Sequence, residues 1–200
     1  MNLLKNLFNR KKHANPAIHA LYRKQKTPCS QSEKIISLLP KLAETYKEGG
    51  VYLLHKTLLD QFEEYDAQYG VTLSKEITEE KSAQMLDKIT SLMLMTCFKE
   101  LSRVLPEGPS PSALTDALHY EIYGALPNQD SFVSYLTYEN PNFEDHKMAP
   151  AFKFGKDISE IVAMPDLAFS FLVSQQFAVI SDVSGRLTRW VLFDEPMESS

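Results

Sequence analysis

The stretch MLDKITSLMLMTCFKEL, residues 85–101, determines the class of fold that the chain can adopt. Its centre, from Leu92 to Phe98, is apolar almost without interruption and so has no polar side to turn toward water. A helix that is apolar all round must be covered by neighbouring elements on every side. We therefore expect residues 85–101 to be the second half of a long helix, from about Ser74 to Leu105, at the centre of a helical bundle.

Apolar residues at steps of three and four recur through most of the remaining chain, as they do in amphipathic helices. The most regular series runs from Val51 to Tyr69, and Gly70 follows it as a residue suited to a helix end. Alternating runs rich in Val, Ile and Thr, the pattern of strands, are nearly absent. The predicted fold is all-α, a single compact bundle of six or seven helices, with further helices at residues 30–48, 112–124, 130–136, 157–164 and 165–190.

Prolines and glycines predict where these helices bend or end. Pro40 is expected to bend the first helix of the bundle, and Gly49-Gly50 to end it. The segment PEGPSPS, from Pro106 to Ser112, contains three prolines and a glycine, which exclude regular structure. In the last helix, Gly185 is the expected position of a kink.

The segment YENPNFEDHKMAPAFKFG, residues 138–155, shows no helical period and is predicted to be one long irregular loop, with a short hairpin as a second reading. Irregular segments of this length are unusual inside compact domains and often carry function. The next helix is expected to begin at Asp157, whose spacing to Glu160 matches a capping box. We expect the loop to contact a partner through Tyr138, Phe143, His146, Phe152 and Phe154.

The chain carries a net charge of −5, but this charge is unevenly distributed. Residues 1–34 contain eight lysines and arginines against one glutamate, a charge of +7, which leaves −12 for the remaining residues. We therefore divide the chain into a basic amphipathic N-terminal arm at 1–29, an acidic helical domain at 30–194 and a disordered tail at 195–200. Because the acidic domain would repel phosphate groups, nucleic acid is not expected as a partner.

Within the arm, the large apolar side chains and most of the basic ones fall on different sides of a predicted helix. Three places for this helix stay open: the protein's own core, another protein, or an anionic membrane surface, where binding would be weak and reversible. A mitochondrial presequence is a further alternative, but the segment has many lysines and few serines, and this composition fits a presequence poorly. The residues expected to make the membrane or partner contact are Leu3, Leu4, Leu7, Phe8, Arg10, Lys11 and Lys12.

The start of the chain does not match a secretory signal, because its positive charges follow the apolar residues instead of preceding them. The densest apolar stretch, LAFSFLVSQQFAVI at 167–180, is interrupted by two serines and two glutamines, so no membrane-spanning helix is expected. Only two cysteines occur, Cys29 and Cys97, which favours a reducing compartment. We expect a cytoplasmic protein, with peripheral attachment to a membrane left open.

No residue pattern typical of catalysis or cofactor binding is present. Phosphate-binding and dinucleotide-binding glycine motifs are missing, and so is the Cys-x-x-Cys spacing of structural zinc sites. Asp116 with His119, and the cluster from Glu144 to His146, come nearest to a metal pattern, but we expect both to be solvated polar groups. Cys97 is expected to be an inert core residue. The sequence therefore predicts no catalytic residue, no metal and no cofactor.

These observations favour a non-enzymatic helical protein that acts through protein–protein contacts, of the adaptor, chaperone-like, immunity or effector type. Neither the partner nor the oligomeric state follows from the sequence. The alternative is an enzyme or small-ligand-binding helical bundle whose site assembles from distant helices. That alternative predicts a concave pocket lined by several of His55, His119, Glu121 and His146.

Overall fold

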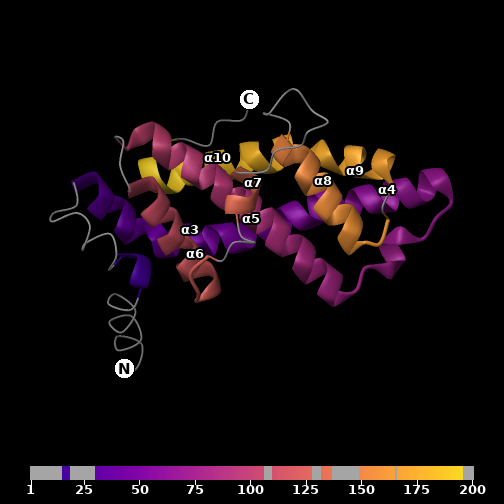
Figure 1. Ribbon diagram of the computed structural model, residues 1–200, viewed down its shortest axis with the longest axis horizontal. Coiled ribbons are helices and arrows are strands. Elements are labelled where there is room, and N and C mark those ends of the chain that lie inside the picture. Colours follow the sequence, from indigo (N-terminus) through magenta and orange to yellow (C-terminus); the bar gives the residue numbers. More distant parts are fainter. Residues whose placement is uncertain are drawn as a thin grey trace.

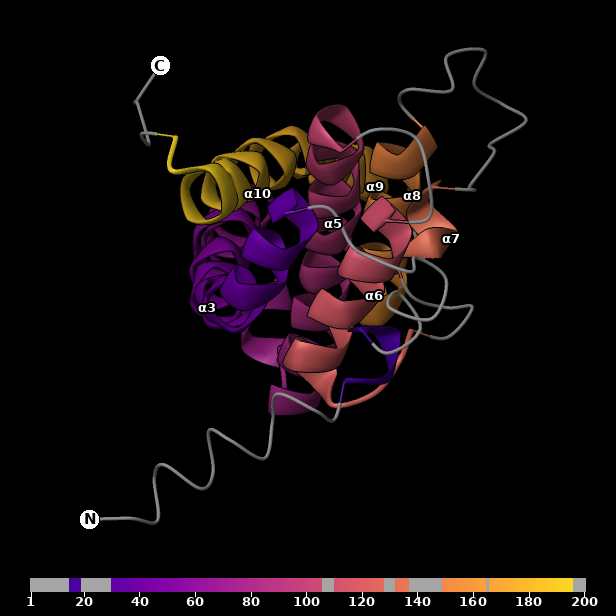
Figure 2. The ribbon, with the colours of Figure 1, turned by 90° about the vertical axis from the view of Figure 1, so that its left-hand side faces the viewer.

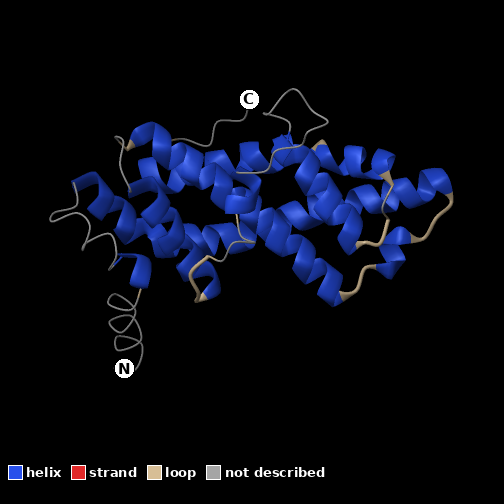
Figure 3. Ribbon diagram, viewed as in Figure 1, coloured by secondary structure: helices blue, strands red, loops and turns tan. Residues whose placement is uncertain are grey.

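A computed structural model describes residues 15–18, 30–105, 110–127, 132–136, 149–164 and 166–195. Within these ranges the regular elements are helices and none is a strand, which confirms the predicted all-α bundle (Figure 1, Figure 3). A helical turn at 16–18 precedes the larger elements. These are α3 (Ser30–Leu53), the π-helical segment η1 (Leu54–Leu59), α4 (Asp60–Tyr69), the 3-10 turn η2 (Leu73–Glu76), α5 (Glu79–Val104), α6 (Ser110–Tyr123), α7 (Val133–Leu136), α8 (Ala149–Ile161), α9 (Leu167–Ser174) and α10 (Gln176–Phe193).

Helix α5 lies at the centre of the molecule, as residues 85–101 predict. Viewed along the long axis, it has α3 and α10 on one side and α6, α7 and α8 on the other (Figure 2). Every residue from Leu92 to Cys97 is buried, and Phe98 is half-buried. Complete burial of a large apolar side chain contributes about 1.5–3 kcal/mol relative to exposure, so cover on every side is the stable arrangement for this helix.

Helix α5 begins at Glu79 instead of near Ser74. The hydroxyl of Thr78 accepts a hydrogen bond from a backbone N–H of the first turn, at 3.2 Å, and so caps the helix. Upstream, the carboxylate of Asp66 accepts hydrogen bonds from the backbone N–H groups of Leu73 and Ser74, each at 2.7 Å, and holds η2 as a separate turn. Hydrophobic spacing alone does not reveal these two caps.

The predicted helix end at Gly49-Gly50 is wrong, because α3 runs through both glycines and continues into η1 and α4. The two glycines instead allow neighbouring helices to approach. A Cβ atom would lie 2.9 Å from Leu187 of α10 at Gly49 and 3.1 Å from Leu86 of α5 at Gly50. Gly70, by contrast, does end α4, with a φ of 67° that suits glycine.

The described part of the predicted loop, residues 149–155, is helical and opens α8. Helix α8 also runs through Asp157, so the predicted helix start at that residue is wrong. Small residues let α8 and α9 pack closely: a Cβ atom at Gly155 would lie 2.0 Å from the Ser170 carbonyl oxygen, and the hydroxyl oxygens of Ser159 and Ser170 are 2.7 Å apart. This tertiary packing, which local periodicity does not show, stabilises the stretch as a helix.

The predicted last helix is divided into α9 and α10, and the division falls at Gln175 instead of at Gly185. The carboxylate of Asp166 caps α9 by accepting a hydrogen bond from the Ala168 backbone N–H at 2.6 Å. Gly185 lies within α10 against α5, where a Cβ atom would be 3.4 Å from a carboxylate oxygen of Glu100. Here too the glycine marks a close helix contact.

Candidate functional site

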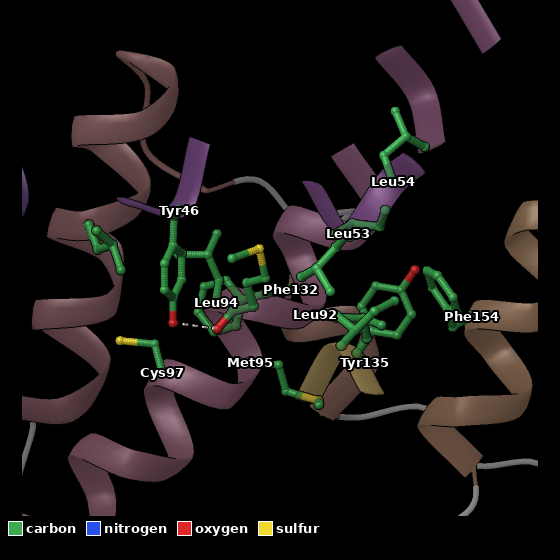
Figure 4. Close-up of a cluster of buried hydrophobic side chains, with 14 of the residues drawn as sticks. Tyr46, Leu53, Leu54, Leu92, Leu94, Met95, Cys97, Phe132, Tyr135 and Phe154 are labelled. Carbon is green, nitrogen blue, oxygen red and sulfur yellow. Dashed lines mark hydrogen bonds between the residues drawn. The ribbon is translucent and has the colours of Figure 1, made fainter. Parts of the chain in front are cut away.

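The interior contains a polar cluster where α3, α5 and α10 meet. The hydroxyl of Tyr46 donates to the carbonyl oxygen of Met93 at 3.1 Å and lies 2.6 Å from Thr188 Oγ1. Cys97 lies near this tyrosine among buried apolar side chains (Figure 4). Burial raises the pKa of the Cys97 thiol to about 12, so the sulfur is protonated near neutral pH and is a poor nucleophile. The cluster links three helices and supplies no reactive group.

A second interior contact joins α5 to α10 through a carboxylate. Glu100, which is largely buried, accepts a hydrogen bond from Arg189 at 2.8 Å and another from Arg103 at 3.2 Å. A carboxylate in such surroundings is stable only when its charge is paired. We therefore interpret this contact as structural.

Asp157 of α8 forms a third polar cluster. Its carboxylate accepts hydrogen bonds from the Tyr135 hydroxyl of α7 at 2.8 Å and from the Lys153 ammonium at 3.0 Å, and Lys88 of α5 lies 3.8 Å away. Burial, and then the negative charge of Asp157, raise the pKa of Tyr135, so its hydroxyl stays a hydrogen-bond donor. The carboxylate is occupied by internal partners and holds α7 and α5 against α8.

Among the residues predicted for a partner loop, the structure describes Phe152 and Phe154. Phe154 is 0% exposed and belongs to the hydrophobic core, so its predicted contact with a partner is wrong. The cause is the helical geometry of α8, which directs Phe154 and Ile158, one turn later, into the interior. Phe152 is half-buried on the same helix. The other three predicted residues, Tyr138, Phe143 and His146, lie outside the described residues.

The residues named for a ligand-binding alternative have separate local partners. His119 is largely buried, and its Nδ1 lies 2.8 Å from the carbonyl oxygen of Ala125. Glu121 pairs with the N-terminal segment, as described next, while His55 is exposed on η1. His146 lies outside the described residues. In the described part of the chain, no three His, Cys, Asp or Glu side chains are grouped so that they could hold a metal ion.

Asn15 attaches the first described residues to α6. Its Nδ2 donates to the carbonyl oxygen of Ala117 at 2.9 Å and to the carboxylate of Glu121 at 3.2 Å. Its Oδ1 accepts from the Ala17 N–H at 3.1 Å and so caps the turn at 16–18. This part of the predicted arm is therefore packed on the helical domain. The predicted contact residues before it, Leu3, Leu4, Leu7, Phe8, Arg10, Lys11 and Lys12, lie outside the described residues.

An exposed apolar surface follows α9 and the first part of α10, which run along one side of the molecule (Figure 1). Exposed fractions are 71% for Leu167, 53% for Phe171 and 44% for Val179. The chain has no charged residue between Asp166 and Asp182. Exposed apolar patches without charge are typical of interaction surfaces. We define this outer face by its exposed residues, which are Leu167, Ala168, Phe171, Gln175, Ala178 and Val179.

The opposite side of α9 packs in the core, where the Phe169 ring centroid lies 5.6 Å from that of Phe62 and 5.4 Å from that of Tyr65. Because α9 is apolar on both sides, its sequence does not indicate which side faces water, and sequence reasoning missed the outer face. Among the described residues, Leu167–Phe193 is also the one helix long and apolar enough to cross a membrane, and 33% of its apolar window is buried. The absence of a transmembrane helix thus stays a prediction.

The outer face differs physically from the three interior clusters. The polar groups of the clusters satisfy one another, whereas the outer face leaves apolar side chains in water. Comparison of the chain with protein-family models, curated proteins and solved structures gives no significant match.

Proposed function

We propose that this is a non-enzymatic helical protein that acts by binding another protein, and that the outer face of α9 and α10 is the binding surface. The proposal is carried by the exposure of Leu167, Phe171 and Val179 on an uncharged helical face. A partner that covered them would gain roughly 1.5–3 kcal/mol for each large side chain fully removed from water. The proposal includes the adaptor, chaperone-like, immunity and effector types, since all of these need such a surface.

The contacts of the interior polar groups indicate that these groups stabilise the fold. Tyr46, Glu100 and Asp157 each engage partners from another helix, and the buried thiol of Cys97 is protonated. Catalysis requires a nucleophile, acid or base that is free to meet a substrate. Tyr46, Glu100 and Asp157 thus serve to connect helices, which favours the binding proposal over the enzyme alternative.

A capture experiment in the native cell extract tests the proposal. Tagged full-length protein would be compared with Phe171→Glu, which places a charge on the outer face, and with Tyr52→Glu as a matched control. Tyr52 is an aromatic residue of α3 with 60% exposure and lies outside the outer face. We expect the wild type and Tyr52→Glu to retain the same protein, and Phe171→Glu to retain at least about tenfold less. Equal retention by Phe171→Glu would contradict the proposal.

We propose in addition that residues 1–12 give a weak, reversible contact with an anionic membrane surface. The amphipathic pattern of Leu3, Leu7 and Lys12 supports it, and so does Asn15, which fixes the chain to α6 just after this segment. Flotation with phosphatidylserine-containing vesicles would compare the full chain with a form that lacks residues 1–12. We expect only the full chain to float, and less so at high salt. Equal recovery of both forms would argue against the contact.

A further inference from the structure

Acidic side chains are concentrated at one end of the molecule. Residues 60–80, which contain α4, η2 and the first residues of α5, have seven acids and one lysine, a charge of −6, against −5 for the whole chain. The carboxylate of Asp66 binds the backbone of η2, and the other six are exposed: Asp60, Glu63, Glu64, Glu76, Glu79 and Glu80. Within the described part of the chain, none of these six forms an ion pair. We call residues 60–80 the acidic end.

The first described residues lie at the opposite end of the molecule. In Figure 1 the turn at 16–18 is on the left and α4 is on the right, and Asn15 is fixed to α6 just before that turn. Between the two ends, α3, η1 and α4 form a continuous helical path of 40 residues, Ser30–Tyr69, which is about 60 Å long. This length is several times the ~8 Å Debye length of physiological salt. A charged surface that touches one end is therefore screened from the charges at the other.

The segment that precedes Asn15 has the opposite charge. Residues 1–12 carry four cations and no acid, and the proposed function assigns them a contact with an anionic membrane. A molecule that lay flat on such a membrane would bring the acidic end to the lipid as well, and its charge of −6 exceeds the +4 of residues 1–12. A molecule that stood on its N-terminal end would bring these cations to the lipid and keep the acidic end away. An anionic surface therefore favours the second orientation.

The outer face is apolar but is poorly suited to an anionic membrane. Helices that lie in the surface of such a membrane combine apolar side chains with lysines and arginines, and no cation occurs between Asp166 and Asp182. Helix α4 also lies beside α9, because the ring of Phe169 contacts the rings of Phe62 and Tyr65. A contact between the outer face and the lipid would therefore bring the carboxylates of α4 toward the same surface.

We propose that the protein stands end-on on an anionic membrane, held by residues 1–12, with the acidic end pointing away from the lipid. This inference rests on the proposed function, which assigns the membrane contact to residues 1–12. Helices α9 and α10 run along the long axis of the molecule (Figure 1). In the end-on orientation the outer face therefore stands along the side of the molecule, where a protein partner can reach it while the protein is bound to the membrane.

Fluorescence quenching on vesicles measures this orientation. A fluorophore would be attached to Asn2→Cys, to Gln68→Cys on α4 or to Gln175→Cys on the outer face, each in a Cys29→Ser background in which Cys97 is buried. The vesicles would contain phosphatidylserine and a lipid whose headgroup carries an energy acceptor. We expect strong quenching at residue 2 and quenching at least about threefold weaker at residue 68, which lies far along the ~60 Å helical path. Residue 175 should also be quenched less than residue 2.

Charge reversal tests whether the acidic end sets the orientation. Glu63→Lys combined with Glu64→Lys changes the charge of residues 60–80 from −6 to −2, and quenching at residue 68 should rise at least about twofold as this end approaches the lipid. Glu44→Lys combined with Glu48→Lys is the matched control, since both glutamates are exposed on α3 and the acidic end keeps its charge. An equal rise in both double variants would show that total charge sets the orientation, and would overturn the proposal.

The failure of the orientation and the failure of the membrane contact give different results. If the chain floats with the vesicles but residue 68 is quenched as strongly as residue 2, the membrane contact stands and the end-on orientation is wrong. If residue 175 is quenched most strongly, lipid covers the outer face and the orientation is wrong as well. A chain that does not float with phosphatidylserine-containing vesicles contradicts both the contact and the orientation.

Discussion

At the scale of single residues, burial and hydrogen bonding fix the chemistry of the few groups that could otherwise react or titrate. Cys97 and Tyr46 lie together in the interior, and burial raises the pKa of both side chains. Asp66 is the opposite case, because hydrogen bonds stabilise its charged form at the end of α4. These two environments lead to measurable differences in reactivity and in pH dependence.

We predict that Cys97 resists alkylation by a maleimide at about pH 8 in the folded protein, because the thiol is buried and its pKa is about 12. A Cys29→Ser variant leaves Cys97 as the single thiol. Mass spectrometry of the labelled protein over time should show a rate at least about 100-fold lower than after unfolding in urea. Rapid labelling of the folded protein would show that the core around α5 is open.

Asp66 should make stability depend on pH. Partial burial alone raises its pKa, but hydrogen bonds from Ser74 and from the Leu73 backbone outweigh burial and hold the pKa below its ordinary value of 3.8. A carboxyl group with a lowered folded pKa stabilises the protein above its unfolded pKa, and this contribution is lost as the pH falls through the folded pKa. The urea midpoint of the wild type should therefore fall more between about pH 6 and about pH 2.5 than that of Asp66→Asn. If the urea midpoints of the wild type and of Asp66→Asn fall by the same amount, Asp66 does not make stability depend on pH.

At the scale of elements, small residues set the distances between helices. Gly155 lets α8 approach the Ser170 carbonyl of α9, and Gly185 lets α10 approach α5. The two sites differ in what a methyl group would meet. At Gly155 the nearest atom is a backbone oxygen, which cannot move alone, whereas at Gly185 it is the end of the Arg189 side chain, at 3.3 Å. Only the first contact is rigid.

We predict that Gly155→Ala lowers the free energy of unfolding by about 1–3 kcal/mol, because the new methyl group forces α8 and α9 apart. Gly185→Ala is the matched control: a shift of a few tenths of an ångström relieves the 3.3 Å contact with Arg189 while its pair with Glu100 stays in place, and alanine favours the helix by up to about 1 kcal/mol. Urea unfolding followed by circular dichroism measures both changes. Equal loss of stability in the two variants would mean that the α8–α9 crossing is not the tighter one.

Helices whose positions follow from the spacing of apolar residues could be predicted from the sequence. The all-apolar run from Leu92 to Phe98 identified the central helix, and Gly70 marked a true helix end. The pattern failed at Gly49-Gly50 and at residues 149–155, because a glycine at a turn and a glycine at a helix contact look alike in sequence. The outer face was missed for a related reason, since Phe169 and Phe171 are equally apolar but only one is buried.

At the scale of the whole molecule, the helices enclose a core in which Tyr46, Glu100 and Asp157 connect neighbouring helices, and apolar area remains exposed along α9 and α10. Phe171 and Val179 lie on this exposed strip, while the other side of the same helices packs on α5 and α8. A protein stabilised only by its own core has no physical need for such a strip. We propose that the function lies where the folded chain leaves this apolar surface exposed.

The most direct test of this account measures whether protein covers the outer face in the cell. Gln175→Cys, on that face, and Gln84→Cys, at an exposed position elsewhere, would be made in the Cys29→Ser background and labelled with a membrane-permeant maleimide. We predict that labelling at residue 175 is at least about tenfold slower in the native cell than in dilute purified protein, with little change at residue 84. Unchanged labelling at both residues would contradict the account.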